Sequence, residues 1–377
     1  MKTKVCHITT VHLPFDDRIF HKECKTLVEA SYEVVLIAQY DREEIKDGVH
    51  IVPLPKTKKR LYRMIYLPIK VLNTALRLKA DVYHFHDPEL IVIGIILKFL
   101  GKQVIYDVHE DYENKILSKY YIPGLIRPFL SRAFGFYEKK VSKIFDAIIT
   151  ADNYVMTKFI NINSAVIRVA NFPPICFAYK FDENVNKNKN KFICVYAGGL
   201  IYDRGISKII ESFCYLKNPD IELILAGKAS SDIYYKIKKI IIKEKRIKYV
   251  GELRWDEVQN LLKIANVGLN LLQPVPAYLY AAENSVKIFE YMAAGIPIIS
   301  SNFPGLKRII EDECSCGICI NSLDPKEIAK AIEYLITHPE EAKKMGENGR
   351  RAVLEQYNWE KESEKLIEIY VKLTGGL

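Results

Sequence analysis

Short runs of β-branched and other apolar residues alternate with amphipathic helical stretches along almost the whole chain of 377 residues. In the first half, these runs predict strands at 5–9, 34–38, 51–53, 82–85, 104–107, 147–150 and 166–169. Helical stretches such as 17–30 and 62–79 separate most of them. Such an alternation is typical of a mostly parallel sheet that crossover helices bury on both faces.

The second half repeats this alternation. Strands are predicted at 192–197, 221–226, 247–250, 267–271, 296–300 and 318–320, with helices at 231–245, 256–265 and 325–337. Between the halves, residues 171–190 contain Pro173, Pro174 and all but the last residue of the polar run ENVNKNKNK, which indicates a linker. We therefore predict an α/β fold of two Rossmann-like, doubly wound domains that face each other across a cleft. The first comprises 1–170 with a C-terminal helix, 358–377, packing back on it, and the second comprises 171–357.

Composition excludes several other classes of protein. Hydrophobic residues make up 49% and charged residues 27% of the chain, which excludes a disordered, collagen-like or coiled-coil protein. No apolar run reaches the roughly 18–20 residues of a membrane-spanning helix. The N-terminal MKTKVCHITT lacks the apolar core and cleavage site of a signal peptide, so we expect a cytoplasmic protein.

The eight cysteines do not indicate a disulfide framework in a chain of this length. Cys314, Cys316 and Cys319 lie close together, but a fourth ligand with suitable spacing is missing. Because a closed structural zinc site requires four ligands, we interpret these three as reduced thiols and expect no metal there.

Positive charge is concentrated in the first half. Of the formal net charge of +9, residues 1–170 contribute +7 and the remainder +2. Residues 56–79 contain eight Lys and Arg and no acidic residue, with Leu61, Ile65, Leu72, Ala75 and Leu76 near helical spacing. A second basic stretch with aromatic residues spans 120–143. Either these are solvated basic faces of helices covering the sheet, or they dock the first domain on an anionic membrane surface.

The segment SVKIFEYMAAGIPIISS, residues 285–301, has the composition of an anion-binding helix start followed by a buried strand. Asn284 or Ser285 suits the N-cap, and the free amides of a first helical turn attract anions. Lys287 adds a positive charge, and Glu290 lies on the same face, where its carboxylate can accept bonds from vicinal hydroxyls. The pattern fits a diphosphate with its ribose, or simply an amphipathic helix with a solvated Lys–Glu pair.

A second segment, YAGGLIYDRG, runs from residue 196 to 205. Gly198 and Gly199 let a phosphate approach the backbone, and Arg204 can clamp phosphate oxygens; a plain tight turn has the same glycine pattern. The GxGxxG turn of nicotinamide-binding domains does not follow the first strand of either half, which argues against a dehydrogenase.

Taken together, GGLIYDRG and KIFEYMAAGIPIISSNFPG resemble the donor-binding segments of retaining glycosyltransferases of family 4, which have the GT-B fold. The resemblance extends to DRIFHKECKTLVEASYEVVLIA, DVYHFHDPEL, QVIYDVHEDY and YNWEKESEKLIEIYVKL, and therefore covers essentially the whole chain. Within the family, the chain is similar to a variant subgroup with the donor motif K-x-F-E-Y-M-A-x-G.

The resemblance implies roles for individual residues. Glu290 matches the second Glu of the family's E-x7-E motif, which holds the nucleotide ribose. The first Glu would fall at Ala282, so that half of the motif is missing, and Glu283 is one position away. Arg204 stands where the family has a diphosphate-binding Lys, whereas Gly199 replaces a frequent Arg.

The resemblance also implies that Lys287 compensates for the charge lost at Gly199, and that His109 lies near the reacting sugar carbon. The family's glycine-rich first loop is replaced by HLPFDDRIF, which alters the acceptor contacts. Base contacts are expected from the loops near Gly227 and Gly251. Neither loop has a pattern specific for uridine or guanosine, and UDP is our working expectation.

Three histidines close or precede strand ends in the first half. His86 and His109 each follow a buried strand and precede a carboxylate, which predicts that both lie at the cleft rim. His84 lies two residues before His86 and is expected to be packed and hydrogen-bonded. GT-B enzymes do not require a bound metal, so we expect no metal ligand among them and choose His109 as the functional histidine.

We therefore predict a retaining, metal-independent glycosyltransferase without a cofactor. It would transfer a sugar from a nucleoside diphosphate sugar to a hydroxyl of a glycan or lipid-linked glycan, in bacterial surface polysaccharide synthesis. Its location would be cytoplasmic and peripheral on the inner face of the membrane, with no nucleic-acid partner. Two alternatives remain: a GT-B-like nucleotide-sugar epimerase, and a nonenzymatic nucleotide-sugar-binding module.

Overall fold

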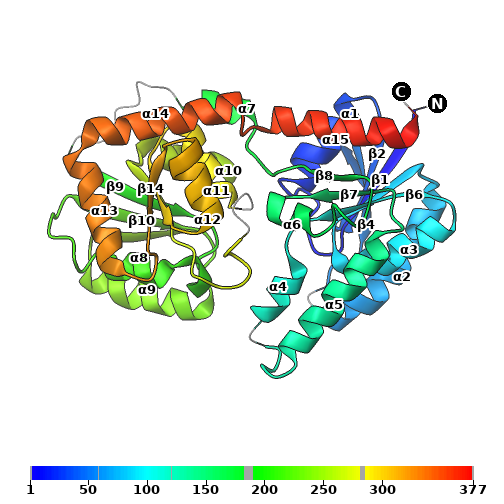
Figure 1. Cartoon of the computed structure of the whole chain (residues 1–377), viewed down its shortest axis with the longest axis horizontal. Helices are drawn as coiled ribbons and strands as arrows, with labels where there is room; N and C mark the ends of the chain where they lie inside the picture. Colours follow the sequence, from blue (N-terminus) through cyan, green and yellow to red (C-terminus); the bar gives the residue numbers. More distant parts are fainter. Residues whose placement is uncertain (1, 58, 120, 182–189, 281–284, 376–377) are drawn as a thin grey trace. The chain divides into compact units, whose positions relative to one another are not determined.

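The computed structural model describes residues 2–57, 59–119, 121–181, 190–280 and 285–375 of the chain. The chain forms two compact units (Figure 1). Unit 1 comprises Met1–Asn171 and Trp359–Leu377, and unit 2 comprises Phe172–Asn358. The structure thus divides the chain after residues 171 and 358, whereas the sequence predicted borders after residues 170 and 357.

Unit 1 is built on an eight-stranded sheet with the order β3-β4-β2-β1-β5-β6-β7-β8. Its strands are β1 (Lys4–Ile8), β2 (Glu33–Gln39), β3 (Glu44–Lys46), β4 (Val49–Leu54), β5 (Val82–Phe85), β6 (Gln103–Val108), β7 (Ala147–Thr150) and β8 (Val166–Arg168). Only β3, a three-residue edge strand that was not predicted, pairs antiparallel. The chain leaves β1 toward β2 and later returns to its other side at β5, so the carboxyl ends of β1 and β5 border a crevice suited to ligands.

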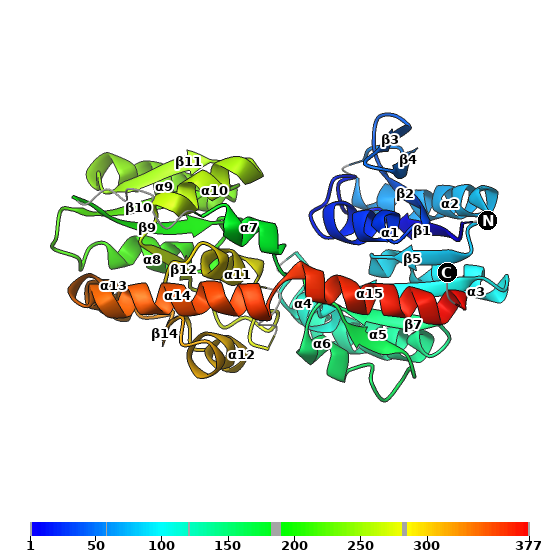
Figure 2. The same ribbon diagram turned by 90° about the horizontal axis from the view of Figure 1, so that it is seen from above.

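Helices cover both faces of this sheet. They are the π-helix η1 (Ile19–Cys24), α1 (Lys25–Glu29), α2 (Arg60–Leu78), the 3₁₀-helix η2 (Pro88–Leu90), α3 (Ile91–Phe99), α4 (Tyr112–Leu117), α5 (Arg127–Ser142), α6 (Asn153–Thr157) and α15 (Trp359–Thr374). One face packs on α2, α3 and α5, and the other packs on η1, α1 and the C-terminal α15. Figures 1 and 2 show α15 lying against the sheet of unit 1.

Unit 2 contains a six-stranded, fully parallel sheet with the order β11-β10-β9-β12-β13-β14. Its strands are β9 (Phe192–Ala197), β10 (Ile221–Ala226), β11 (Ile247–Gly251), β12 (Val267–Asn270), β13 (Ile298–Ser301) and β14 (Gly317–Ile320). Here the chain switches sides between β9 and β12, so these two strand ends border the corresponding crevice.

The helices of unit 2 also form two layers. They are α7 (Ile175–Tyr179), the 3₁₀-helix η3 (Tyr202–Arg204), α8 (Ile206–Ser212), α9 (Ser231–Lys243), α10 (Trp255–Ile264), α11 (Val286–Ala293), α12 (Pro304–Lys307), the π-helix η4 (Arg308–Glu313), α13 (Pro325–Thr337) and α14 (Pro339–Glu355). Side chains of α8, α9 and α13 bury one face of the sheet, and α11 packs on α14. The prediction of two parallel-sheet α/β domains is thus confirmed.

Two local details of the structure run against the sequence pattern. Proline disfavours a helix interior, yet Pro68 lies inside the continuous helix α2, because Leu67, Val71 and Ala75 are buried against the sheet and hold the helix there. Part of the expected linker is also structured, since α7 and the buried Phe172 belong to unit 2. Residues 182–189 of that linker lie outside the described residues.

Candidate functional site

In unit 2, glycines open the backbone where β9 and β10 end. Gly198 has φ +143° and Gly227 has φ +126°, values that favour glycine. A Cβ atom added to Gly227 would lie 2.0 Å from the carbonyl oxygen of Gly198, so no side chain fits there. The Gly227 amide donates to Gly251 O at 2.6 Å, which brings the loops after β9, β10 and β11 together.

Two cationic side chains converge on this glycine backbone. Arg204 ends η3, and Lys287 lies in the first turn of α11. A Cβ atom added to Gly198 would lie 3.5 Å from Arg204 Nη1 and 3.7 Å from Lys287 Nζ. The structure therefore brings together Gly198, Gly199, Arg204 and Lys287, which lie in two separate segments of the sequence.

The electrostatics of this corner favour an anion. Only 9% of Lys287 is exposed, and its Nζ lies 4.8 Å from the ring centroid of Tyr196. Burial and the nearby Arg204 charge lower the pKa of Lys287 to about 7, although Glu290 acts in the opposite direction. A bound polyanion would relieve the repulsion between the two cations and restore the charge on Lys287.

Ser285 holds the start of α11 in a way the sequence did not predict. It occupies the N-cap position, but its side chain does not cap the helix. Instead Ser285 Oγ donates to Asn270 Oδ1 at 2.9 Å, and the Asn270 amide in turn donates to Ser300 Oγ at 3.1 Å. These bonds anchor the helix start to the ends of β12 and β13. The neighbouring Ala282, Glu283 and Asn284 lie outside the described residues.

Glu290 lies one turn after Lys287 on α11 and is partly exposed. Its charge acts on Lys287 strongly enough to oppose the fall in the pKa of that lysine. The carboxylate is therefore close enough to Lys287 for its charge to affect that lysine. Its contact with a ribose stays a prediction.

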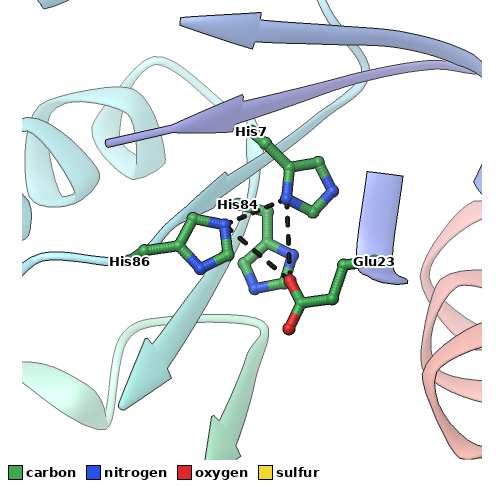
Figure 3. A group of neighbouring side chains, drawn as sticks. All are labelled: His7, Glu23, His84 and His86. Carbon is green, nitrogen blue, oxygen red and sulfur yellow. Dashed lines mark hydrogen bonds and ion pairs between the residues drawn. The ribbon is translucent and has the colours of Figure 1, made fainter. Parts of the chain in front are cut away.

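In unit 1, buried imidazoles gather where β1 and β5 end (Figure 3). His7 and His84 are Cα partners across the two strands, and His86 follows β5 directly. All three are fully buried, so His86, which was predicted to lie at the cleft rim, is not accessible; Glu23 Oε2 of η1 lies 3.9 Å from its Nε2. Burial lowers the pKa of His86 to about 4 despite the neighbouring Asp107. His84 is packed as predicted, with Nδ1 2.8 Å from the hydroxyl of Tyr370 on α15.

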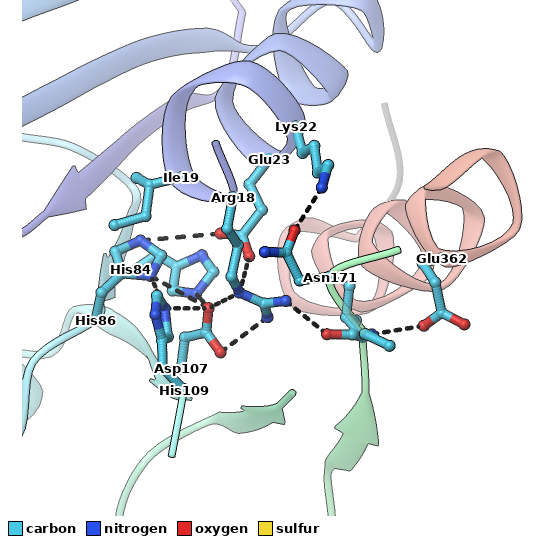
Figure 4. Close-up of polar contacts among 12 residues, drawn as sticks. Arg18, Ile19, Lys22, Glu23, His84, His86, Asp107, His109, Asn171 and Glu362 are labelled. Carbon is cyan, nitrogen blue, oxygen red and sulfur yellow. Dashed lines mark hydrogen bonds and ion pairs between the residues drawn. The ribbon is translucent and has the colours of Figure 1, made fainter. Parts of the chain in front are cut away.

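His109 follows β6 and keeps 10% of its side chain exposed. Its Nε2 lies 3.0 Å from Asp107 Oδ2 and 3.0 Å from His86 Nδ1 (Figure 4). The ring therefore has a fixed orientation, and Nδ1 is the nitrogen left for other partners. The ring of His12 lies 4.9 Å from that of His109, centroid to centroid.

Asp107 is held by a buried arginine that the sequence analysis missed. Arg18 Nε and Nη2 donate to the two Asp107 oxygens at 3.1 and 3.0 Å, and Nη1 donates to Val169 O at 2.7 Å. Burial alone would raise the pKa of Asp107, but Arg18 and His109 hold it well below its usual range. The carboxylate is therefore a permanent anion that orients the imidazoles around it.

The loop that replaces the family's glycine-rich segment also joins this cluster. The Thr10 amide and the Thr9 hydroxyl donate to Asp87 Oδ2 at 2.6 and 2.9 Å, and His12 Nδ1 lies 3.1 Å from Asp16 Oδ2. Sequence reasoning missed His12, and it noted Asp87 only as the carboxylate after His86 in the segment HFHDPEL, which marks a strand end.

Other predictions about ligands have mixed outcomes. All eight cysteines are free. In contrast, two groups in unit 1 have ligand atoms close enough to hold a metal ion: His7, Glu23, His84 and His86, and His86, Asp107 and His109. Among the described residues, no helix is both long and apolar enough to cross a membrane.

Comparisons with known proteins identify the two units. Residues 17–170 match the family model "Glycosyltransferase Family 4", and residues 179–352 match "Glycosyl transferases group 1". A putative glycosyltransferase, EpsD, of Bacillus subtilis is 22% identical over 97% of this chain and 93% of its own length. An α-(1→4)-mannosyltransferase of Mycolicibacterium hassiacum is 22% identical over 78% of this chain and 71% of its own. A capsular polysaccharide biosynthesis glycosyltransferase of Staphylococcus aureus is 26% identical over 52% of this chain and 51% of its own.

Solved structures share the fold over nearly the whole chain. The sucrose-phosphate synthase of Thermosynechococcus elongatus has a TM-score of 0.78 at 18% identity, covering 99% of this chain and all of that one. HepE of Anabaena, solved with UDP and glucose, has a TM-score of 0.73 at 15% identity, covering 98% of this chain and 100% of its own. With family models matched in both units and this fold, the chain is a glycosyltransferase of the GT-B type.

Proposed function

We propose that the protein is a retaining, metal-independent glycosyltransferase that transfers a sugar from UDP-sugar to a hydroxyl of a glycan or lipid-linked glycan. One observation carries the proposal: Arg204 and Lys287 converge on the open backbone at Gly198 and Gly199. Two basic side chains beside a backbone without Cβ atoms form a site for the diphosphate of the donor. UDP is supported by the relative HepE, which was solved with UDP and with UDP-glucose.

In this proposal, the protein stabilises the leaving group. The bond between the anomeric carbon and the diphosphate breaks, and the acceptor oxygen forms its bond on the same face of the sugar. Arg204 and Lys287 neutralise the charge that builds on the departing diphosphate. The acceptor proton goes to a diphosphate oxygen, so no protein general base and no metal ion is needed. Glu290 binds the ribose hydroxyls, and His109 is assigned to the reacting sugar.

The first experiment measures transfer with a panel of UDP-, GDP- and ADP-sugars and simple glycoside acceptors. We expect turnover with a UDP-sugar, a product that keeps the anomeric configuration of the donor by NMR, and equal turnover with and without added Mg²⁺ or Mn²⁺. An inverted product, or strict dependence on an added ion, would overturn the respective part of the proposal. Conversion of the donor sugar into another sugar without an acceptor would instead indicate an epimerase. Binding of the donor without any turnover or donor hydrolysis would indicate a binding module.

We further propose that unit 1 docks on the anionic inner face of the cytoplasmic membrane, where a lipid-linked acceptor of surface polysaccharide synthesis would be found. Apolar side chains are exposed on α2 and near α5, including Leu61 (74%), Leu125 (97%) and Phe129 (72%). In contrast, Ala75, one of the apolar residues near helical spacing in 56–79, is buried in the core and cannot contact a membrane. Beside these side chains, Lys59, Arg60, Arg63 and Lys119, with Thr57 and Tyr121, line a pocket of about 360 Å³ that suits a phosphate headgroup.

Vesicle flotation tests the docking surface. We expect the protein to float with vesicles containing anionic lipid at low salt, and to stay unbound with zwitterionic vesicles. The double variant Lys59→Ala/Arg60→Ala should lose flotation, whereas the control Lys236→Ala/Lys239→Ala, which removes the same charge from α9 of unit 2, should retain it. Equal flotation of both variants would show that net charge, not this surface, is responsible.

A further inference from the structure

We propose that unit 1 binds one structural transition-metal ion of the Zn²⁺ type between His7, Glu23 and His86, with His84 beside it. Figure 3 shows these four side chains turned toward one another from β1, β5, the residue that follows β5, and η1. All four are fully buried, so the ion would lie inside the unit and not at the proposed donor site in unit 2. The inference goes beyond the proposed transfer reaction and does not depend on it.

The distances between the three principal ligand atoms fit a metal ion. His7 Nδ1 lies 3.0 Å from His86 Nε2, and Glu23 Oε2 lies 3.8 Å from the first and 3.9 Å from the second. The point equidistant from the corners of this triangle is about 2.1 Å from each atom, the usual length of zinc bonds to imidazole nitrogen and carboxylate oxygen. His84 also offers a ring nitrogen within 4.8 Å of the other ligand atoms.

The far atom of each principal ligand is held by a second residue, as is usual around metal sites. His7 Nε2 lies 3.3 Å from the Tyr370 hydroxyl, and His86 Nδ1 lies 3.2 Å from Asp107 Oδ2 (Figure 4). Glu23 Oε1 lies 2.9 Å from Arg18 Nε. These contacts turn the other ligand atom of each residue toward the shared centre.

Without an ion, the cluster leaves buried polar atoms unsatisfied. Among the described residues, Glu23 Oε2 and His84 Nε2 have no hydrogen-bond partner, and Glu23 Oε1 forms an ion pair with Arg18 in place of a hydrogen bond. A buried carboxylate without hydrogen bonds is costly, and a metal ion would supply the missing partner. The single positive charge of Arg18 faces two carboxylates, Glu23 and Asp107, so a bound cation would also offset the excess negative charge.

The second group, His86, Asp107 and His109, is the weaker candidate. Both Asp107 oxygens already accept hydrogen bonds from Arg18, and Oδ2 also contacts both imidazoles. An ion there would have to displace these partners. The other alternative is a proton in place of the ion, which would form a direct N–H···N bond between His7 and His86.

The metal content of the full chain tests the proposal. The protein is produced without a histidine tag or chelator, and its zinc is measured by mass spectrometry after dialysis. We expect about one Zn²⁺ per chain, and we expect Co²⁺ exchanged into the site to give the visible absorption of a four-coordinate ion. The variants His7→Gln and Glu23→Gln should contain less than a tenth of that metal. His338→Gln, which removes a histidine from unit 2, should keep it.

Two outcomes would overturn the proposal. A wild-type chain that contains no metal and takes up none from excess Zn²⁺ would overturn the proposal and leave the proton-bridged pair. Loss of metal in His109→Gln but not in Glu23→Gln would also overturn it and assign the ion to the second group. If a variant fails to fold, the metal content and the Co²⁺ spectrum of the wild-type chain still decide.

Discussion

The strand ends of the two units use arginine in opposite ways. In unit 1, Arg18 is buried and its charge is taken up by Asp107 and Glu23, so it orients neighbouring groups and offers nothing to a ligand. In unit 2, Arg204 faces another cation, Lys287, across a backbone of glycines. Two like charges held close together destabilise the empty site. When an anion binds, the same two charges stabilise the complex. The comparison shows that similar sheets can form either a preorganised polar network or an anion site.

The largest expected effect is on the stability of unit 1. Arg18→Met removes one partner of a buried ion pair and leaves Asp107 uncompensated, which should lower the free energy of unfolding by about 3–5 kcal/mol. Urea denaturation followed by circular dichroism measures this. Arg42→Met, which breaks an exposed pair with Glu44, is the matched control and should change little. A loss no greater than that of the control would contradict the structural role of Arg18.

The next effect is on catalysis by unit 2. Arg204→Ala and Lys287→Ala should each lower turnover by roughly 10–1000-fold, because each removes charge that stabilises the leaving diphosphate. Affinity for uridine, which has no phosphate, should change much less. Lys208→Ala, a change at a partly exposed lysine paired with Glu211, serves as the control. Near-normal turnover in both site variants would contradict the prediction that Arg204 and Lys287 stabilise the leaving diphosphate.

A smaller effect concerns the ribose. Glu290→Gln should weaken UDP binding by about 1–3 kcal/mol, as expected for a lost charge-assisted hydrogen bond. Titration calorimetry measures the binding of UDP and of 2′-deoxy-UDP to the wild type and to the variant. The four affinities form a double-mutant cycle in which the ligand hydroxyl is the second group removed. The wild type should prefer UDP, and the variant should bind the two ligands about equally. The assignment fails if the preference for UDP survives in the variant.

The last effect is a pH dependence of stability. The pKa of Lys287 is about 7 in the folded protein and near 10.5 when unfolded, so between these values the unfolded chain holds a proton that the fold lacks. Stability from this group therefore rises with pH across that window. Lys287→Met should accordingly be more stable than the wild type, with an advantage that shrinks between pH 6 and pH 9 in thermal denaturation. An advantage that grows with pH would contradict the lowered pKa.

The sequence predicted the fold better than it predicted the sites. Buried parallel strands form continuous apolar runs, so the alternation revealed the strands except β3, a short edge strand with the sequence EIK. Arg204 and Lys287 were found because each lies beside a local glycine or helix-start pattern. The network of Arg18 and Asp107 was missed because these residues are 89 positions apart, and only the pairing of β1, β5 and β6 brings them together.

The most direct test of the anion site is the proton balance of UDP binding. At pH 7.5, much of the free protein has neutral Lys287, and a bound diphosphate should restore its charge. Calorimetry in buffers of different ionisation enthalpy should therefore show net proton uptake when UDP binds, and none when uridine binds or when UDP binds to Lys287→Met. Equal proton uptake for UDP and uridine, or none for UDP, would contradict the claim that Arg204 and Lys287 form the diphosphate site.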